Sequence, residues 1–196
     1  MAALRADAQR SIERILDAAV EELALDPEAS MAAVARRAGV VRATVYVHFP
    51  TREALVAAVT ERAMAEAAGA VRAAEPDRGD PADALRRVLE AAWHVLARHH
   101  ALVASTTRRE SEEVRRLHGP VLGLLQPLLR RGQADGVFAD SVPVDWLLTV
   151  VLELVHVASR EVSAGRMTDR EAERALLATV SGALGARAPS ARAGTS

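Results

Sequence analysis

One segment of this sequence carries positive charge without an acidic counterpart. No Asp or Glu occurs between Glu28 and Glu53, although the whole chain of 196 residues sets 26 acidic residues against 25 basic ones. The basic residues of the segment are Arg36, Arg37, Arg42, His48 and Arg52. Guanidinium groups bind phosphate oxygens through charge and paired N–H donors, so the segment is suited to a nucleic-acid backbone. On spacing alone, a solvated surface face accounts for the same cluster.

A second group of residues has the types that bind metal ions. Glu153 and His156 form a Glu-x-x-His motif, which in a helical bundle supplies half of a dinuclear site. The second motif of such a site is missing, and a mononuclear site would have to recruit His94, His99 and His100. Solvated or capping histidines explain these residues better. We therefore expect no metal and no cofactor, and a helical-bundle metal-binding protein stays an alternative.

Residues for catalysis are not arranged in any recognisable motif. Nothing in the sequence resembles a catalytic triad, a phosphate-binding loop or a redox motif. The chain has no Cys, which excludes disulfides, thiolate metal ligands and thiol-based sensing. We expect no enzymatic activity, so any switch must work by binding, protonation or modification.

The composition favours an all-α protein. Half of the residues are apolar, Ala dominates among them, and aromatic residues make up only 3% of the chain. Small apolar residues suit closely packed helices better than a β-sandwich. Charges interrupt every apolar segment before it reaches the roughly 18 residues of a membrane helix, and the N-terminus does not resemble a signal peptide. We therefore expect a cytoplasmic protein without a membrane partner.

The elements around the basic segment predict a helix-turn-helix. Apolar residues at helical spacing indicate a helix over residues 8–25, and Ser30 can cap a short second helix that ends at Gly39 with a positive φ. A third helix over residues 42–48 ends before Pro50, because the residue before a proline is pushed out of the α region. Two short helices joined by such a turn place the second one in the major groove of DNA. Residues 42–48 are therefore the candidate recognition helix.

The remaining helices are predicted from their caps and breaks. Thr51 caps a fourth helix that runs toward about residue 73, a linker covers residues 75–81, and Asp80 with Pro81 begins the next helix. Farther along, Pro120 and Pro127 should break or kink a helix, and Gly132 with Gly136 should end it. Pro143 opens a strongly apolar helix. The last helix begins with a capping box formed by Thr168 to Glu171.

These elements predict about nine helices in two domains. Residues 8–56 form the DNA-binding helix-turn-helix domain, and the fourth helix continues to about residue 73 as a connector. Residues 80–186 form a helical domain for ligand binding and dimerisation. Residues 187–196 are expected to be a disordered tail because of their Ala, Ser, Arg and Pro content.

The stretch from Ser30 to Leu55 resembles the DNA-binding signature of the TetR family of bacterial regulators. The most specific part is the Ala38-Gly-Val40 turn, followed by Thr44, Tyr46, His48-Phe49 and Arg52-Glu-Ala-Leu55. The resemblance implies a homodimer whose two recognition helices enter successive major grooves of a palindromic DNA operator. It also implies that the last two long helices form a four-helix bundle across the dimer.

Seven residues are predicted to contact DNA: Ser30, Arg42, Ala43, Thr44, Tyr46, His48 and Arg52. Arg42 can reach a guanine edge, while Ala43 and the Thr44 methyl group can touch a thymine methyl. Tyr46 and Arg52 are better placed for phosphates, and the resemblance adds His48 to these backbone contacts.

Three residues depart from the family pattern. Val41 replaces a small hydroxyl residue that commonly caps the recognition helix, so the start of that helix is less well fixed. Val47 replaces a polar or aromatic residue and removes one possible hydrogen bond to a base edge. Arg52 replaces Lys, which keeps the charge but changes the hydrogen-bond geometry.

The C-terminal half is predicted to hold an effector between its helices. The candidate ligand-binding residues are Trp93, Leu96, His100, Leu125, Trp146, Thr149, Glu153 and His156. The scarcity of aromatic residues disfavours flat multi-ring cations and favours a modest apolar or amphipathic molecule.

Together these features predict a sequence-specific DNA-binding transcriptional regulator. The preferred hypothesis is a repressor that a small, mostly apolar ligand releases from its operator. Besides the metal-binding protein, the alternative is a protein-interaction adaptor that retains a decayed DNA reader.

Overall fold

The computed structural model describes residues 2–100 and 111–185, and within these ranges it contains eight helices and no strand. The helices are α1 (Ala2–Leu25), α2 (Met31–Ala38), α3 (Arg42–His48), α4 (Arg52–Ala73), α5 (Pro81–Leu96), α7 (Ser111–Ala134), α8 (Val144–Ser163) and α9 (Asp169–Ala183). The prediction of an all-α fold with an N-terminal helix-turn-helix is confirmed. The predicted disordered tail over residues 187–196 lies outside the described residues.

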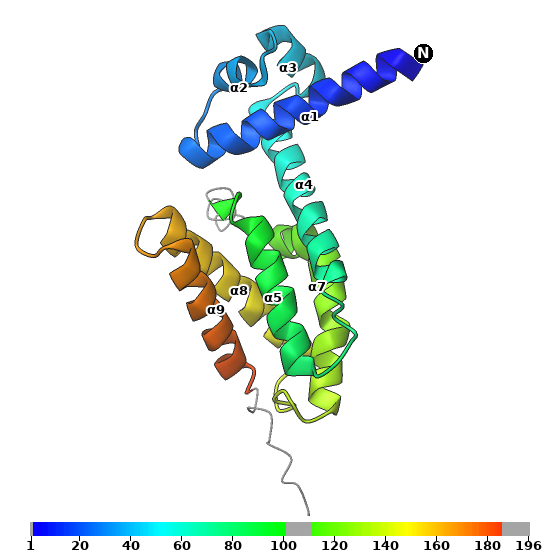
Figure 1. The fold of residues 1–196 in the computed structure, drawn as a ribbon, viewed down its shortest axis with the longest axis vertical. Helices are drawn as coiled ribbons and strands as arrows, with labels where there is room; N and C mark the ends of the chain where they lie inside the picture. The colour runs from blue at the N-terminus through cyan, green and yellow to red at the C-terminus, as the bar shows by residue number, and fades with distance from the viewer. Residues whose placement is uncertain (1, 101–110, 186–196) are drawn as a thin grey trace, which may run out of the picture.

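Helix α4 connects the two ends of an elongated molecule (Figure 1). Its first turns pack against α1, and its later turns pack against α5 and α7. Helices α8 and α9 lie side by side and complete the larger end, where α5 contacts α9 and α7 contacts α8. Helix α4 is therefore part of both ends of the molecule.

The buried apolar side chains form two main clusters, one at each end of α4. The smaller cluster joins α1, α2 and α3 to Leu55 and Val59 of α4. The larger cluster begins at Val71 of α4 and extends through α5, α7, α8 and α9. Met64 of α4 lies between them and packs with Leu96 of α5. Each fully buried Val, Leu, Ile, Phe or Met side chain in these clusters contributes about 1.5–3 kcal/mol of hydrophobic stabilisation.

The helix boundaries follow the local caps that the sequence predicted. The Ser30 hydroxyl accepts a hydrogen bond from the Ala33 N–H at 3.2 Å, and Gly39 ends α2 with φ of 66°. The Thr51 hydroxyl caps α4 at the Ala54 N–H, 3.1 Å away. Thr168 and Glu171 form the predicted capping box of α9. Each cap satisfies N–H groups that the first helical turn leaves without a partner.

One predicted boundary was wrong. Helix α1 begins at Ala2 rather than at residue 8, because the Ala-rich segment before residue 8 has high helix propensity and allows the helix to extend. Helix α7 ends at Ala134, between the two glycines that were predicted to end it, and the turn follows at Gly136, where φ is 70°. Gly132 packs directly against the Phe138 ring.

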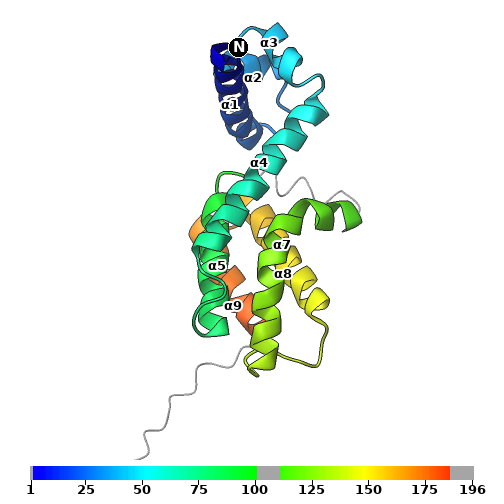
Figure 2. The same cartoon turned by 90° about the vertical axis from the view of Figure 1, so that its right-hand side faces the viewer.

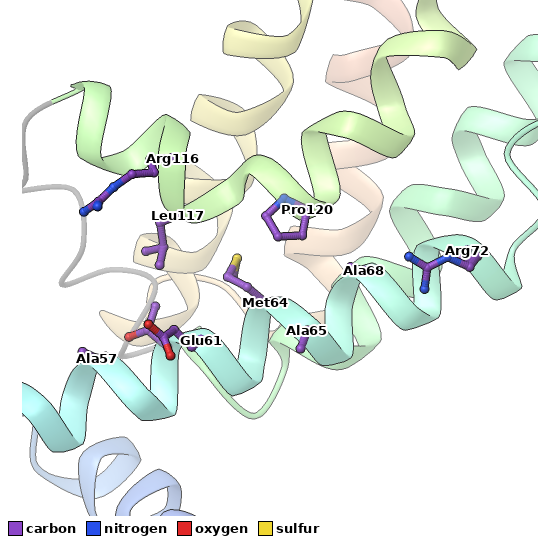
Figure 3. Close-up of a pocket in the computed structure, with 10 residues that line it drawn as sticks. Ala57, Glu61, Met64, Ala65, Ala68, Arg72, Arg116, Leu117 and Pro120 are labelled. Carbon is purple, nitrogen blue, oxygen red and sulfur yellow. The ribbon is translucent and has the colours of Figure 1, made fainter. Parts of the chain in front are cut away.

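Helix α7 continues through both of its prolines and bends, as the sequence allowed. Figure 2 shows the N-terminal part of α7 turned sharply away from the rest of the helix. Pro120 lies at this bend, where its ring removes a backbone hydrogen bond (Figure 3). The bend opens space between α7 and α4.

Candidate nucleic-acid interface and internal cavity

Helix α3 is held in place by its buried face, which leaves the opposite face open. Val45 is fully buried, and Phe49 follows it into the cluster that contains Val34, Ala38 and Leu55. The outward residues are Arg42, Ala43, Tyr46 and Val47, while Thr44 and His48 are half-buried. The structure therefore brings five of the seven predicted DNA-contact residues together on one short helix, as expected for a recognition helix.

The start of α3 lacks a side-chain cap. Val41 occupies the N-cap position in an extended conformation and makes no side-chain hydrogen bond to the helix. This agrees with the expectation drawn from its apolar side chain. Arg42, the first residue of α3, instead donates a hydrogen bond to the Tyr46 hydroxyl at 3.1 Å.

The four arginines of the acid-free segment do not act alike. Arg36 is exposed and Arg42 projects from α3, so both present charge to solvent. Arg37 instead donates to Glu22 at 2.5 Å and to Glu21 at 2.9 Å. These two hydrogen bonds raise the pKa of Arg37, and the bond to Glu22 contributes more than the bond to Glu21. The charge of Arg37 is therefore used mainly to join α2 to α1.

Arg52 also has partners within the chain. Its guanidinium donates to the carbonyl oxygens of Pro27 and Ala29, the latter at 3.3 Å, and lies 3.8 Å from the Glu28 carboxylate. These contacts tie the start of α4 to the loop between α1 and α2. Ser30, the last of the predicted contact residues, lies at the end of that loop with its hydroxyl capping α2.

Comparison with known proteins assigns this N-terminal region to a family. The protein-family model described as "Bacterial regulatory proteins, tetR family" matches residues 15–59, from the middle of α1 to the first turns of α4. The helix-turn-helix of this chain is therefore similar to that of TetR-family regulators.

Curated TetR-type relatives match parts of the chain. The repressor NicS from Pseudomonas putida is 27% identical over 121 residues, which are 57% of this chain and 57% of NicS. The repressor LfrR from Mycolicibacterium smegmatis is 38% identical over 82 residues, which are 42% of this chain and 43% of LfrR. The chain thus spans about half the length of these relatives.

Solved structures of TetR-like proteins share the whole fold. LfrR from Mycobacterium smegmatis in complex with proflavine superimposes with a TM-score of 0.71 at 24% identity, covering 88% of this chain and 95% of LfrR. FadR from Bacillus subtilis in complex with stearoyl-CoA gives a TM-score of 0.70 at 19% identity, covering 86% of this chain and 96% of FadR. Both likenesses establish the fold of the C-terminal helices as well.

An apolar cavity of about 50 Å³ lies between α4, α5, α7 and α8. Its wall is formed mainly by aliphatic side chains such as Met64, Val88, Leu125 and Val151. Among the lining residues that the structure describes, only His118 has a polar side chain. The cavity is smaller than the roughly 300–1,000 Å³ of typical ligand sites, so a ligand would have to widen it or enter from a neighbouring space.

Such a space lies along the same face of α4. An open groove of about 670 Å³ runs between α4 and the bent part of α7 (Figure 3). Met64 borders both the groove and the cavity, and Leu117 and Pro120 form the α7 side of the groove. Thr60, Glu61, Arg72 and Arg116 supply polar groups along the groove. The cavity is thus apolar, and the groove beside it is mixed in polarity.

The predicted ligand residues fall into three groups. Leu96 and Leu125 line the cavity. Trp93, His100 and His156 are buried but do not line the cavity. Trp146, Thr149 and Glu153 border neither the cavity nor the groove, and their assignment as ligand-binding residues stays a prediction. Trp146 is 59% exposed. Periodicity within one helix does not show which of its faces the neighbouring helices cover.

The buried histidines have structural partners. His100 lies 3.2 Å from the Ser159 hydroxyl and 2.8 Å from Asp169, which joins the segment after α5 to α8 and α9. The His156 ring meets the His118 ring edge to face, with 5.2 Å between centroids. Burial lowers the pKa of His156 to about 4, and the nearby His118 and Arg160 contribute to this shift. His156 is therefore neutral at physiological pH.

The Glu-x-x-His motif is not part of a metal-binding cluster in the described ranges. Glu153 and His156 approach to 4.0 Å, but no third His, Asp or Glu of those ranges joins them in a group that could hold an ion.

Among the residues that the structure describes, no helix is both long enough and apolar enough to cross a membrane.

The residues that sequence reasoning missed lie mainly on α4. Met64, Ala67 and Val71 line the cavity and continue the apolar stripe of α4 beyond Ala63 at helical spacing. This signal was present in the sequence. His118 had no comparable signal, because the bend at Pro120 decides where it points.

Proposed function

We propose that this chain is a sequence-specific transcriptional repressor that binds a palindromic DNA operator as a homodimer. The observation that carries the proposal is the recognition helix α3, which is anchored by buried Val45 and begins with the exposed Arg42, while the exposed Arg36 lies on α2. Residues 8–56 serve as the reader, α4 as the connector and residues 80–186 as the effector and dimerisation domain. This role requires no catalytic residues and no cofactor, and the protein performs it in the cytoplasm, together with the DNA.

The proposed base contacts come from Arg42, Ala43 and Thr44, and the proposed phosphate contacts come from Tyr46 and His48. Ser30 and Arg52 lie close to the DNA backbone in this arrangement, although both side chains also bind within the protein. Such contacts to phosphate fix the register, whereas contacts to base edges select the sequence.

The proposed dimer interface uses α8 and α9. Trp146 and Val157 are among the exposed large apolar side chains of the described residues, and both lie on α8. A four-helix bundle formed by α8 and α9 of two copies covers this surface. It also holds two α3 helices at a fixed separation, which must match about 34–36 Å between successive major grooves.

The proposed effector is a small, mostly apolar molecule that enters through the α4–α7 groove. Aliphatic side chains line the cavity, so an acyl chain such as that of stearoyl-CoA, present in the FadR complex, fits better than a flat cation such as proflavine, present in the LfrR complex. Widening the cavity displaces α4 and moves α3 out of register with the groove. Coupling of about 1–3 kcal/mol weakens operator binding roughly 5–150-fold.

The DNA-binding part of the proposal is tested by fluorescence anisotropy with DNA from upstream of the protein's own gene, at two salt concentrations. We expect tight binding in excess competitor DNA, strongly weakened in Arg42→Ala and Tyr46→Ala. Arg130→Ala removes an exposed arginine from α7 and serves as the charge-matched control that binds normally. Binding to this DNA and to genomically selected fragments no better than to random DNA contradicts the proposal and favours an adaptor.

The effector part is tested by titrating stearoyl-CoA or proflavine into the operator complex. We expect the acyl probe to release the DNA and proflavine to have little effect. Stearoyl-CoA that binds the protein but leaves operator affinity unchanged contradicts the release mechanism.

A further inference from the structure

The outward face of the recognition helix is unusually apolar. Val47 is 77% exposed, the largest value among the exposed large hydrophobic residues of the described chain. Ala43 precedes it by four residues and is also exposed, so the two side chains are neighbours on one face of α3. A single exposed valine is ordinary on a protein surface, but this pair occupies the part of α3 that faces away from its own core.

The surroundings of this pair are cationic. Arg42 lies next to Ala43 in α3, and no acidic residue occurs between Glu28 and Glu53. An apolar patch within a positive field matches a partner that combines negative charge with a local apolar feature. The major groove of DNA has both, because phosphates line its edges and the thymine C5-methyl group projects into it.

The other groups on α3 leave the reading of A·T pairs to apolar contact. The helix contains no Asn or Gln, which are the side chains that pair with adenine in the major groove. Ala43 and Val47 are both exposed on the outward face of α3. Beside the base contacts proposed above for Arg42 and Thr44, this pair offers an apolar surface that suits a thymine methyl group.

We propose that Val47 and Ala43 read thymine methyl groups, so that each operator half-site carries thymine beneath α3. This inference rests on the proposed function and specifies the chemistry that the reader recognises. Removing one buried methyl group costs about 0.8 kcal/mol, which corresponds to about a fourfold loss of affinity.

The test uses the full-length protein and an operator obtained by selecting bound DNA. Each thymine of one half-site is replaced in turn by deoxyuridine, which lacks only the methyl group and keeps the base pair. At one or two positions we expect wild-type binding to weaken about fourfold. Val47→Ala should bind the thymine operator about as weakly as the wild type binds the deoxyuridine operator, and should lose most of its response to the replacement.

Leu25→Ala is the matched control, since Leu25 is also an exposed large apolar residue of the N-terminal part but lies at the end of α1. It should retain the full response to deoxyuridine. Val47 is exposed, so Val47→Ala is expected to fold, and its melting temperature checks this. Selective DNA binding that is insensitive to deoxyuridine, or equally sensitive in Val47→Ala, overturns this inference alone. A protein that selects no sequence overturns the proposed function with it.

Discussion

The Arg42 guanidinium lies over the Tyr46 ring, with its central carbon 5.3 Å from the ring centroid and one N–H 3.1 Å from the hydroxyl oxygen. The two residues are one helical turn apart on α3, so the contact depends only on local geometry. It restrains a long side chain before DNA arrives, which lowers the entropy lost on binding.

Tyr46→Phe separates the two parts of this contact. The ring and its attraction for the guanidinium remain, but the hydroxyl is lost to both Arg42 and the DNA phosphate. We expect operator affinity to fall by about threefold to tenfold, the value of roughly one hydrogen bond, with an unchanged melting temperature. Tyr46→Ala should weaken binding further in the same anisotropy titration. Equal affinity of wild type and Tyr46→Phe would show that the hydroxyl contacts nothing in the complex.

Arg52→Ala should affect stability as well as DNA binding. The change removes donors from the Pro27 and Ala29 carbonyl oxygens and frees the start of α4 from the α1–α2 loop. We expect the free energy of unfolding to fall by about 1 kcal/mol in urea denaturation without DNA. Arg36→Ala is the control, because Arg36 is an exposed arginine of α2 outside the hydrogen bonds found in the described chain. If both variants unfold like the wild type, Arg52 contributes only charge.

Gly132→Ala should destabilise the C-terminal helices. A Cβ at this position would lie 2.0 Å from Cδ2 of Phe138, whose ring is buried and cannot simply turn away. We expect a loss of about 1–3 kcal/mol in the free energy of unfolding, as for other overpacked sites. Gly69→Ala in α4 provides the contrast, since a Cβ there meets no atom within 4 Å. It should gain about 0.5–1 kcal/mol from better helix propensity, and a similar gain for Gly132→Ala would refute the packing argument.

Burial of His156 should make the protein less stable in mild acid. Its pKa is about 4 in the folded chain and 6.5 when unfolded, so between these values the unfolded chain binds the additional proton. The contribution of neutral His156 to the free energy of unfolding is therefore fully present above the pKa of the unfolded chain and is lost as the pH falls toward the folded pKa. The loss is about 1 kcal/mol between roughly pH 7.5 and pH 5.5.

Urea denaturation at these two pH values measures this loss. His156→Leu should reduce the dependence on pH, leaving the smaller share of His99, whose pKa burial also lowers. His94→Ala changes an exposed histidine and should keep the wild-type dependence. A His156→Leu variant with the full wild-type dependence would place the proton uptake elsewhere.

The features that the sequence predicted correctly depend on residues close together in the chain. The Ser30 cap, the positive φ of Gly39 and the capping box of Thr168 and Glu171 each involve at most four consecutive positions. The alternation of buried Val45 with exposed Val47 follows in the same way from the helical repeat. The helix-turn-helix and the family resemblance could therefore be found from the order of the residues alone.

The tertiary structure alone decided which distant groups meet. Nothing near Arg52 in the sequence indicates that it binds the carbonyl of Ala29. Nothing near Gly132 in the sequence predicts that the Phe138 ring lies in the space that a side chain at position 132 would need. The cavity likewise depends on the bend of α7, which brings His118 toward Met64 of α4. Local caps and periodicity specify each helix and its apolar stripe, but partner choice depends on how several helices pack together to bury those stripes at close-packed density.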